Sequence, residues 1–280
     1  MATPPPSDVL VTRDGLALKQ RRWRAVGRVR GTILIVHGLG EHGGRYQRLA
    51  MHLTKQGWNV ASYDLRGHGE SEGRRGHIRS LEDHLDDLGL VMDAVRSSRP
   101  GAPLILLGHS MGGQIAALMM ARSYRPANGL ILSSPALMVP MTALQRIQLV
   151  VGGALAPNLR VRNGLPVDKL SHSQAVVTAY RNDPLVHDAI TPRLAWSVIR
   201  GGAEVLRKAK EWKVPTLLLW AGDDHCVNPS GSARFALQAP QHLVKSKSFP
   251  GLYHEIFNER HPEPVLAALD AWLEERYPRI

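Results

Sequence analysis

Ser110 stands at the centre of the pentapeptide Gly108-His109-Ser110-Met111-Gly112, a G-x-S-x-G pattern that can present a serine hydroxyl as a nucleophile. An apolar run at 104–107 precedes this pattern, and a run of helix-forming residues at 113–121 follows it. Strand, sharp turn and helix are the context that the pattern needs, because the turn lifts the hydroxyl above the sheet edge, beside the positive end of the helix. Glycine is needed at both flanks because a Cβ there would collide with the neighbouring strand or helix. The pattern therefore predicts a serine nucleophile.

A serine hydroxyl is a weak nucleophile at neutral pH and needs a general base. Where a G-x-S-x-G serine is used, the partners follow in the chain order Ser, Asp or Glu, His. The chain has 13 histidines, and His254 lies after the last expected strand and before the C-terminal helix, where that order puts the base. His242 precedes the strand, His261 lies further along, and most other histidines come before Ser110. We therefore predict His254 as the base.

Two adjacent aspartates, Asp223 and Asp224, compete for the role of the acid after the strand expected at 216–220. Asp224 fits better because Val227 follows it by three residues and Pro229 by two more. That spacing puts an apolar side chain under the loop and the proline near the start of the next helix. Asp224 would accept a hydrogen bond from His254 and stabilise the imidazolium. Asp223 would then be a surface or loop-capping residue.

The tetrahedral intermediate of acyl transfer needs backbone N–H donors, each worth roughly 2.7–4 kcal/mol of barrier. We predict that Met111 supplies one donor and Leu39 the other, from the glycine-rich loop at 37–44, which His37 would brace. A phosphate-binding loop is the rival interpretation, but G-x-x-x-x-G-K-[ST] is absent from the loop. A metal site at His37 and His42 lacks a third ligand at a useful spacing. We predict no metal and no cofactor.

Strand-like and helical patterns alternate along the chain, which predicts an α/β fold with a mostly parallel sheet and helices on both faces. Strands are expected at 32–36, 58–63, 104–107, 129–132, 216–220 and 243–249, and helices at 46–56, 81–97, 111–122, 231–238 and 264–276.

The interval 135–210 breaks this rhythm, because it holds helical patterns and no convincing strand. Helices are expected around 144–155, 174–180 and 193–208. We interpret 135–210 as a helical cap over the site, since ligands of such sheets bind outside the carboxyl ends of the strands. A plain connecting layer of helices is the alternative. The domains would be a disordered lead-in at 1–12, a core at 13–134 and 211–280, and the cap.

One apolar stripe of the cap includes Ile147, Val151 and Leu155, with Leu149 and Val150 beside it. These side chains are candidates for contact with an acyl chain or a bilayer. The alternative, that they form the buried core of the cap, is equally compatible with the pattern.

The chain of 280 residues carries a net charge of +11, which would suit nucleic acid or an anionic membrane surface. No nucleic-acid-binding signature accompanies the charge, so we expect no nucleic-acid partner. The densest basic cluster is interpreted as the solvated face of an N-terminal hairpin, with attraction to anionic lipid as the second interpretation. That cluster comprises Lys19, Arg21, Arg22, Arg24, Arg28 and Arg30.

The single cysteine, Cys226, rules out an intramolecular disulfide and fits a reducing compartment. The first residues have neither the basic nor the apolar region of a signal peptide, and no apolar run reaches the length of a transmembrane helix. We expect a cytoplasmic protein with transient membrane or micelle contact through the cap. The sequence leaves the oligomeric state open.

Four motifs together resemble the monoacylglycerol lipase family, which overlaps the lysophospholipases and the serine aminopeptidase-like α/β-hydrolases. The similarity covers the chain from Asp14 onwards, and Ala221 stands where the family has a loop glycine before the acid. The resemblance implies the α/β-hydrolase fold, hydrolysis of monoacylglycerols to glycerol and fatty acid, no cofactor, and a mobile cap that contacts lipid. The motifs are 37–42, 63–71, 108–113 and 253–259, and the segment 182–187 resembles bacterial members.

Other functions stay open on the same residues. A lysophospholipase or a general carboxylesterase would use the same serine, acid and base. A serine aminopeptidase would also need a cap carboxylate for the substrate ammonium, for which Asp183 or Asp188 could serve. A non-catalytic binding protein is the third alternative. Asp64 and Arg66 are interpreted as a buried ion pair that shapes the loop beside the nucleophile, and His68 as structural.

Overall fold

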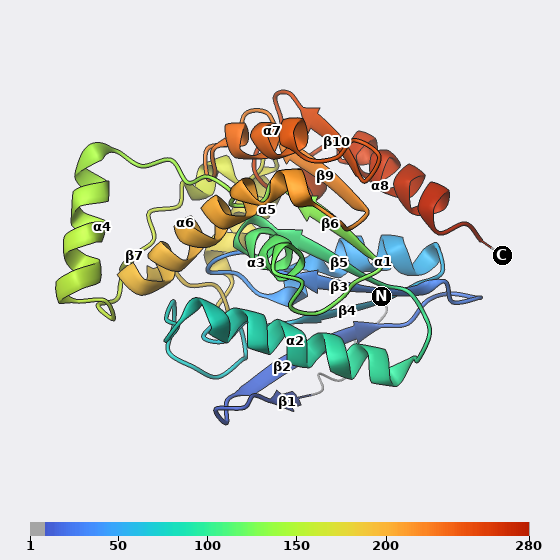
Figure 1. Ribbon diagram of the computed structural model, residues 1–280, viewed down its shortest axis with the longest axis horizontal. Coiled ribbons are helices and arrows are strands. Elements are labelled where there is room, and N and C mark those ends of the chain that lie inside the picture. The colour runs from blue at the N-terminus through green and yellow to red at the C-terminus, as the bar shows by residue number, and fades with distance from the viewer. Residues whose placement is uncertain (1–8, 280) are drawn as a thin grey trace.

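An eight-stranded sheet crosses the molecule in the computed structural model, which describes residues 9–279 (Figure 1). The strand order is β1-β2-β4-β3-β5-β6-β9-β10, and all neighbours from β4 to β10 are parallel. Only the N-terminal pairs β1–β2 and β2–β4 are antiparallel within this sheet. The predicted mostly parallel sheet is therefore confirmed. The strands are β1 (Val9–Val11), β2 (Ala17–Trp23), β3 (Gly31–Val36), β4 (Trp58–Tyr63), β5 (Leu104–His109), β6 (Gly129–Ser133), β9 (Thr216–Ala221) and β10 (Val244–Phe249).

Helices cover both faces of the sheet, as the continuous apolar strands require. In β3, Ile33 and Ile35 point into one core cluster and Leu34 and Val36 into the other, and all four are fully buried. The first cluster lies under α1 (Gln47–Lys55) and α8 (Glu263–Arg276). The second lies under α2 (Leu81–Ser98), α3 (Ser110–Ala121) and α7 (Pro229–Gln238).

The segment between β6 and β9 is mainly helical. Two strands of two residues each, β7 and β8, pair antiparallel within it, so the expectation that it holds no strand is wrong. Two residues are too few to show the alternation of apolar and polar side chains that predicts a strand. The elements are α4 (Ala143–Leu155), β7 (Val161–Arg162), α5 (Gln174–Asn182), β8 (Ala189–Ile190) and α6 (Pro192–Arg207). Short 3₁₀ turns lie at Gly43–Tyr46, Val167–Lys169, Ala209–Glu211 and Ile256–Asn258.

Helix α4 stands away from the body of the molecule at the left of Figure 1. None of its residues is buried, and its contacts run to α6, where Trp196 donates to the Leu149 carbonyl at 3.2 Å. The alternative that its apolar stripe forms a buried cap core is therefore wrong. Thr142 and Gln145 form a capping box that starts this helix.

The N-terminal hairpin corrects two expectations. Residues 9–11 form β1, so the disordered lead-in does not extend to residue 12, and residues 1–8 lie outside the described part. The basic cluster is not a wholly solvated face, because Arg21 is buried and bonds Asp64 at 2.5 Å. Arg30 is also largely covered and donates to the Leu273 carbonyl at 3.0 Å. Both partners are distant in sequence, so the local pattern could not reveal them.

Across residues 9–279, no helix has the length and apolar character needed to cross a membrane.

Candidate active site

Ser110 lies at the turn between β5 and α3, at the carboxyl end of the parallel strands. Its φ of +53° is a left-handed conformation that a serine rarely adopts. The flanking glycines make it possible, because a Cβ at Gly108 would lie 2.6 Å from the Gly112 carbonyl oxygen. A Cβ at Gly112 would lie 2.2 Å from the carbonyl oxygens of Val36 and His37. The pentapeptide thus forms the tight strand–turn–helix connection that its sequence predicts.

The structure brings Asp224 and His254 together from the loops after β9 and β10. The Asp224 Oδ2 atom accepts from His254 Nδ1 at 2.7 Å, while its Oδ1 atom accepts from the backbone N–H groups of Cys226 and Val227 at 2.8 and 3.0 Å. Both side chains are almost fully buried. Asn228 caps α7, which begins at Pro229 as the spacing predicted.

The charges of this pair shift both pKa values. Burial alone would lower the pKa of His254, but the charge and hydrogen bond of Asp224 outweigh it and raise that pKa above 6.5. Burial alone would raise the pKa of Asp224, but the interaction with His254 and the two backbone N–H groups lower it. Asp224 is therefore ionised near neutral pH and favours a proton on His254.

Asp223 is different from its neighbour. Its side chain is 54% exposed and lies 3.2 Å from the Nε2 atom of His225. Within residues 9–279, no hydrogen bond or ion pair joins it to His254. The geometry thus favours Asp224 over Asp223 as the partner of the histidine.

The ring of His109, the residue before Ser110, lies 4.6 Å from the ring of His254. In the described part of the chain, no hydrogen bond joins the Ser110 hydroxyl to His254. Such bonds are often loose in enzymes without substrate. The role of Ser110 as the nucleophile that His254 activates remains a prediction.

The glycine-rich loop after β3 lies against Ser110. A Cβ on Gly38 would be 3.2 Å from the Ser110 Cβ atom. Within residues 9–279, the N–H groups of Leu39 and Met111 have no hydrogen-bond partner, so both donors remain available. His37 braces the loop, since its Nδ1 atom lies 2.8 Å from the Gly38 carbonyl oxygen and its Nε2 atom accepts from the Leu65 N–H at 2.8 Å. Burial lowers the pKa of His37, which keeps it neutral.

A buried network of ion pairs joins this loop to the loop that carries His254. The sequence analysis did not predict this network. Arg45 donates to Glu41 at 2.6 Å and to both oxygens of Glu255 at 2.6 and 2.9 Å. Glu41 also accepts from the Gly38 N–H at 2.6 Å and from the Tyr46 hydroxyl at 2.7 Å. Burial would raise the pKa of Glu41, but the charge of Arg45 prevails and lowers it to about 2. The i, i+4 spacing of Glu41 and Arg45 is the feature of the sequence that could have indicated this ion pair.

The segment between β6 and β9 packs onto the same loop. The guanidinium of Arg45 lies 4.7 Å from the ring centre of Tyr180 in α5, and the Gly40 carbonyl accepts from the His187 N–H at 2.9 Å. Asp183, considered as a site for a substrate ammonium, bonds His42 at 2.8 Å. Asp188, the other candidate, bonds Arg162 at 2.6 Å. Both carboxylates are thus already paired.

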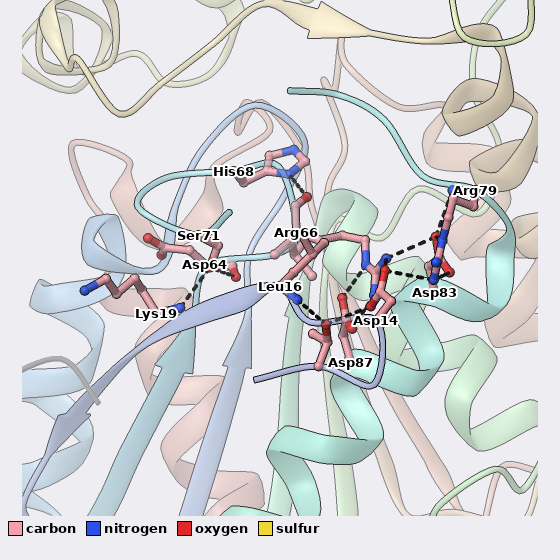
Figure 2. A network of polar contacts seen from close by, with 12 residues as sticks. Asp14, Leu16, Lys19, Asp64, Arg66, His68, Ser71, Arg79, Asp83 and Asp87 are labelled. Carbon is pink, nitrogen blue, oxygen red and sulfur yellow. Dashed lines mark hydrogen bonds and ion pairs between the residues drawn. The ribbon is translucent and has the colours of Figure 1, made fainter. Parts of the chain in front are cut away.

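Asp64 and Arg66 do not pair with each other, so the predicted ion pair between them is wrong. Asp64 accepts from Arg21 and from the Gly43 N–H at 2.8 Å, whereas Arg66 forms a two-point contact with Asp87 at 2.6 and 2.7 Å (Figure 2). His68 is buried, and its Nδ1 atom lies 3.0 Å from the Arg66 carbonyl oxygen. This contact within its own loop fits the structural role predicted for His68.

Ligand atoms of Asp224, Cys226 and His254 lie within 4.8 Å of one another and form the group in residues 9–279 that could hold a metal ion. The carboxylate and the imidazole already bond each other at 2.7 Å. His37 and His42 do not belong to this group. The Asp224 and His254 atoms of this group are therefore accounted for by the hydrogen bond between them.

The cap candidates Ile147, Val151 and Leu155 are 60%, 49% and 81% exposed on α4. Their contact with a substrate stays a prediction.

The sequence matches the serine aminopeptidase, S33 (Hydrolase_4) family over residues 27–261. A monoacylglycerol lipase of Mycolicibacterium smegmatis is 34% identical over 87% of this chain and 88% of that protein. The phospholipase YtpA of Bacillus subtilis is 32% identical over 90% of this chain and 98% of that protein. An uncharacterised abhydrolase domain-containing protein of Dictyostelium discoideum is 33% identical over 95% of this chain, which spans only 29% of that protein.

Among solved structures, the monoacylglycerol lipase of Paleococcus ferrophilus superposes with a TM-score of 0.84 at 32% identity, over 92% of this chain and 99% of that one. The fold and these relatives define a serine hydrolase with the α/β-hydrolase fold. The chain belongs to the serine aminopeptidase, S33 family, and the resemblance to its monoacylglycerol lipases is confirmed.

Proposed function

We propose that this protein hydrolyses monoacylglycerols to glycerol and free fatty acid through Ser110, Asp224 and His254. The observation that carries the proposal is the buried 2.7 Å bond between Asp224 and His254, beside a serine in a left-handed turn. The relatives named monoacylglycerol lipase support the substrate class.

In this mechanism the Ser110 oxygen attacks the ester carbonyl carbon while His254 takes the hydroxyl proton. The negative charge of Asp224 stabilises the imidazolium that forms. The N–H groups of Leu39 and Met111 donate to the oxyanion of the tetrahedral intermediate. His254 then gives its proton to the departing glycerol oxygen, which leaves an acyl group on Ser110.

The second half of the cycle repeats these roles with water. His254 takes a proton from water, the resulting nucleophile attacks the acyl-enzyme, and the returning proton releases Ser110. The fatty acid leaves as a carboxylate. No cofactor or metal is needed for any of these steps.

We also propose that residues 135–210 act as a cap over a core of 13–134 and 211–280. The exposed α4 side chains Ile147, Val151 and Leu155 would meet the acyl chain or a transient membrane or micelle surface. Their large exposed fractions support this role, because exposed apolar patches mark surfaces that contact a membrane, a ligand or another protein.

Fatty-acid release from 1-monoacylglycerols of several chain lengths tests the proposal. Diacylglycerol, lysophosphatidylcholine and an aminoacyl amide serve as competing substrates, and Ser110→Ala serves as the inactive control. We expect monoacylglycerol to be turned over fastest and Ser110→Ala to lose nearly all activity. Full activity of Ser110→Ala would refute the nucleophile, and Ser110-dependent turnover of another substrate alone would refute the monoacylglycerol assignment.

A lysophospholipase is the second candidate, favoured by the relative named phospholipase. The basic chain, with a net charge of +11, would attract anionic interfaces. Faster release from lysophosphatidylcholine than from a monoacylglycerol of the same acyl chain would favour it.

A further inference from the structure

Ser134, the residue that follows β6, has a backbone conformation that side chains seldom adopt. Its φ is +41°, and among the non-glycine residues of 9–279 only Ser110 and Ser123 share a positive φ. Such strain persists only where the surrounding structure fixes it, and Ser134 is fully buried. Because glycine would adopt this conformation without strain, the contacts of the Ser134 hydroxyl show what the serine side chain contributes.

The Ser134 hydroxyl takes the place of a backbone acceptor at the end of the sheet. The strands β6 and β9 pair as far as Ser133 and Leu219, and the Ser134 N–H then donates to the Leu219 carbonyl at 2.9 Å. Further along β9, the N–H of Ala221 donates to the Ser134 Oγ atom at 3.2 Å. Ala221 is fully buried, and a buried N–H without an acceptor is costly. The hydroxyl therefore holds the end of β9 against the end of β6.

This bond lies three residues before Asp224. The N–H groups of the two residues after Ala221 donate to carbonyls at the end of β10 and just beyond it, at 2.9 and 3.2 Å. Together with the 2.7 Å bond between Asp224 and His254, these contacts make the acid loop and the base loop one bonded unit. The bond from Ala221 to Ser134 fixes that unit on its β6 side.

The residues that follow Ser134 contact the turn that carries the nucleophile. The Ala136 N–H donates to the Ser110 carbonyl at 2.9 Å. Pro135 packs on the start of α3, where a Cβ at Gly113 would lie 2.9 Å from the Pro135 Cβ atom. The segment 134–136 thus contacts the nucleophile turn and the unit of acid and base loops at once. A displacement at Ser134 would change the position of one relative to the other.

We propose that Ser134 is a positioning residue, which holds the acid and base loops in place relative to the nucleophile turn through its hydrogen bond with the Ala221 N–H. The need for this acceptor explains why a serine and not a glycine occupies the left-handed position. The inference rests on the proposed function, since Ser134 acts through Ser110, Asp224 and His254 and not on the substrate.

Three variants test the proposal. Ser134→Gly removes the hydroxyl and relieves the backbone strain, whereas Ser134→Ala removes the hydroxyl and keeps the strain. Ser123→Gly is the matched control, because Ser123 has a φ of +50° but is exposed, and its side chain has no hydrogen bond with residues 9–279. For each variant we would measure kcat and KM with a soluble p-nitrophenyl ester, the pH dependence of kcat/KM, and the Tm.

We expect both Ser134 variants to lower kcat about tenfold and to leave KM within about twofold, because the acid and base are misplaced while ester binding is not. The pH midpoint of kcat/KM should fall towards that of Asp224→Asn, since Asp224 is less well held beside His254. The Tm of Ser134→Gly should stay within about 2 °C of that of the unaltered protein, because strain relief offsets the lost bond. Ser123→Gly should leave kcat and the pH midpoint unchanged.

A pH midpoint that is unchanged in both Ser134 variants would overturn the positioning role, even if kcat fell together with the Tm. Equal kinetics of Ser134→Gly and Ser123→Gly would also overturn it. Ser110→Ala and Asp224→Asn separate this failure from a failure of the proposed function. If either of them stayed fully active, the proposed catalytic residues would be wrong, and this inference with them. If both lost activity while Ser134→Gly behaved like Ser123→Gly, only the role of Ser134 would be wrong.

Discussion

Two adjacent carboxylates, Asp223 and Asp224, have opposite surroundings. Asp224 is buried and accepts three hydrogen bonds, whereas Asp223 is exposed beside His225. The sequence could favour Asp224 because the positions of Val227 and Pro229 fix the turn. It could not show the depth of burial, which depends on loops distant in the chain.

We expect Asp224→Asn to lower kcat by about 10⁴-fold, because an amide favours the wrong tautomer of the histidine. Asp223→Asn removes the same charge one position away and should leave kcat within about twofold, because exposed charges interact weakly. Steady-state kinetics with a soluble ester compare the two. A larger loss in Asp223→Asn would exchange their roles.

The pH dependence of kcat/KM reports the pKa of the general base. His254 must be neutral to accept the serine proton, and Asp224 raises its pKa above 6.5 despite burial. Activity should therefore rise with pH through a midpoint above 6.5 and be lost below it. In Asp224→Asn, burial is no longer opposed by the carboxylate charge, so the midpoint of the residual activity should fall. An unchanged midpoint would exclude His254 as the titrating base.

At the level of elements, the long strands and helices could be predicted because their apolar periodicity is strong. The expected strand at 58–63 coincides with β4, and the expected helix at 81–97 differs from α2 by one residue. The strand β2 has no such pattern, since it reads ALKQRRW and buries Arg21 against Asp64. A buried arginine can be recognised only with its partner.

Arg45 connects the loop after β3 to the loop that carries His254, so we expect Arg45→Met to affect both stability and rate. Leaving Glu41 and Glu255 buried without their cation should cost about 3–5 kcal/mol. Misplacement of the two loops should lower kcat on the order of 100-fold. Chemical unfolding and kinetics at a temperature where the variant is folded separate these effects.

Arg48→Met is the matched control, because Arg48 is an exposed residue of α1, three positions after Arg45. Arg45→Lys keeps the charge but loses the two-point contact with Glu255, so it should recover stability in part. If Arg45→Met and Arg48→Met behaved alike, the network would have no positioning role.

On the scale of the whole molecule, Arg66 connects the N-terminal hairpin to the helical layer (Figure 2). It bonds Asp87 of α2 at 2.6 Å and Asp14 of the hairpin at 3.1 Å. The sequence could not show this connection, since Asp14, Arg66 and Asp87 are widely separated along the chain. The Arg66 side chain bonds the carboxylates of Asp14, Asp83 and Asp87, which indicates a role in stability.

Arg66→Met should lower the free energy of unfolding by about 3–5 kcal/mol, because it leaves Asp87 buried and unpaired. Arg79→Met removes an arginine from the same network, but its side chain is 60% exposed, so we expect little change. The kcat/KM of folded Arg66→Met should equal that of the unaltered protein. Denaturant unfolding followed by circular dichroism measures the first effect, and equal stability of the two variants would contradict it.

The chain's one thiol, Cys226, is buried, and burial raises its pKa. Because the thiolate is the reactive form, maleimide dyes should modify the unaltered protein slowly. A cysteine introduced by Leu155→Cys, at a position 81% exposed on α4, would instead react readily. The protein is therefore suited to single-site fluorescent labelling, and a dye on α4 would report directly whether that helix leaves water for lipid.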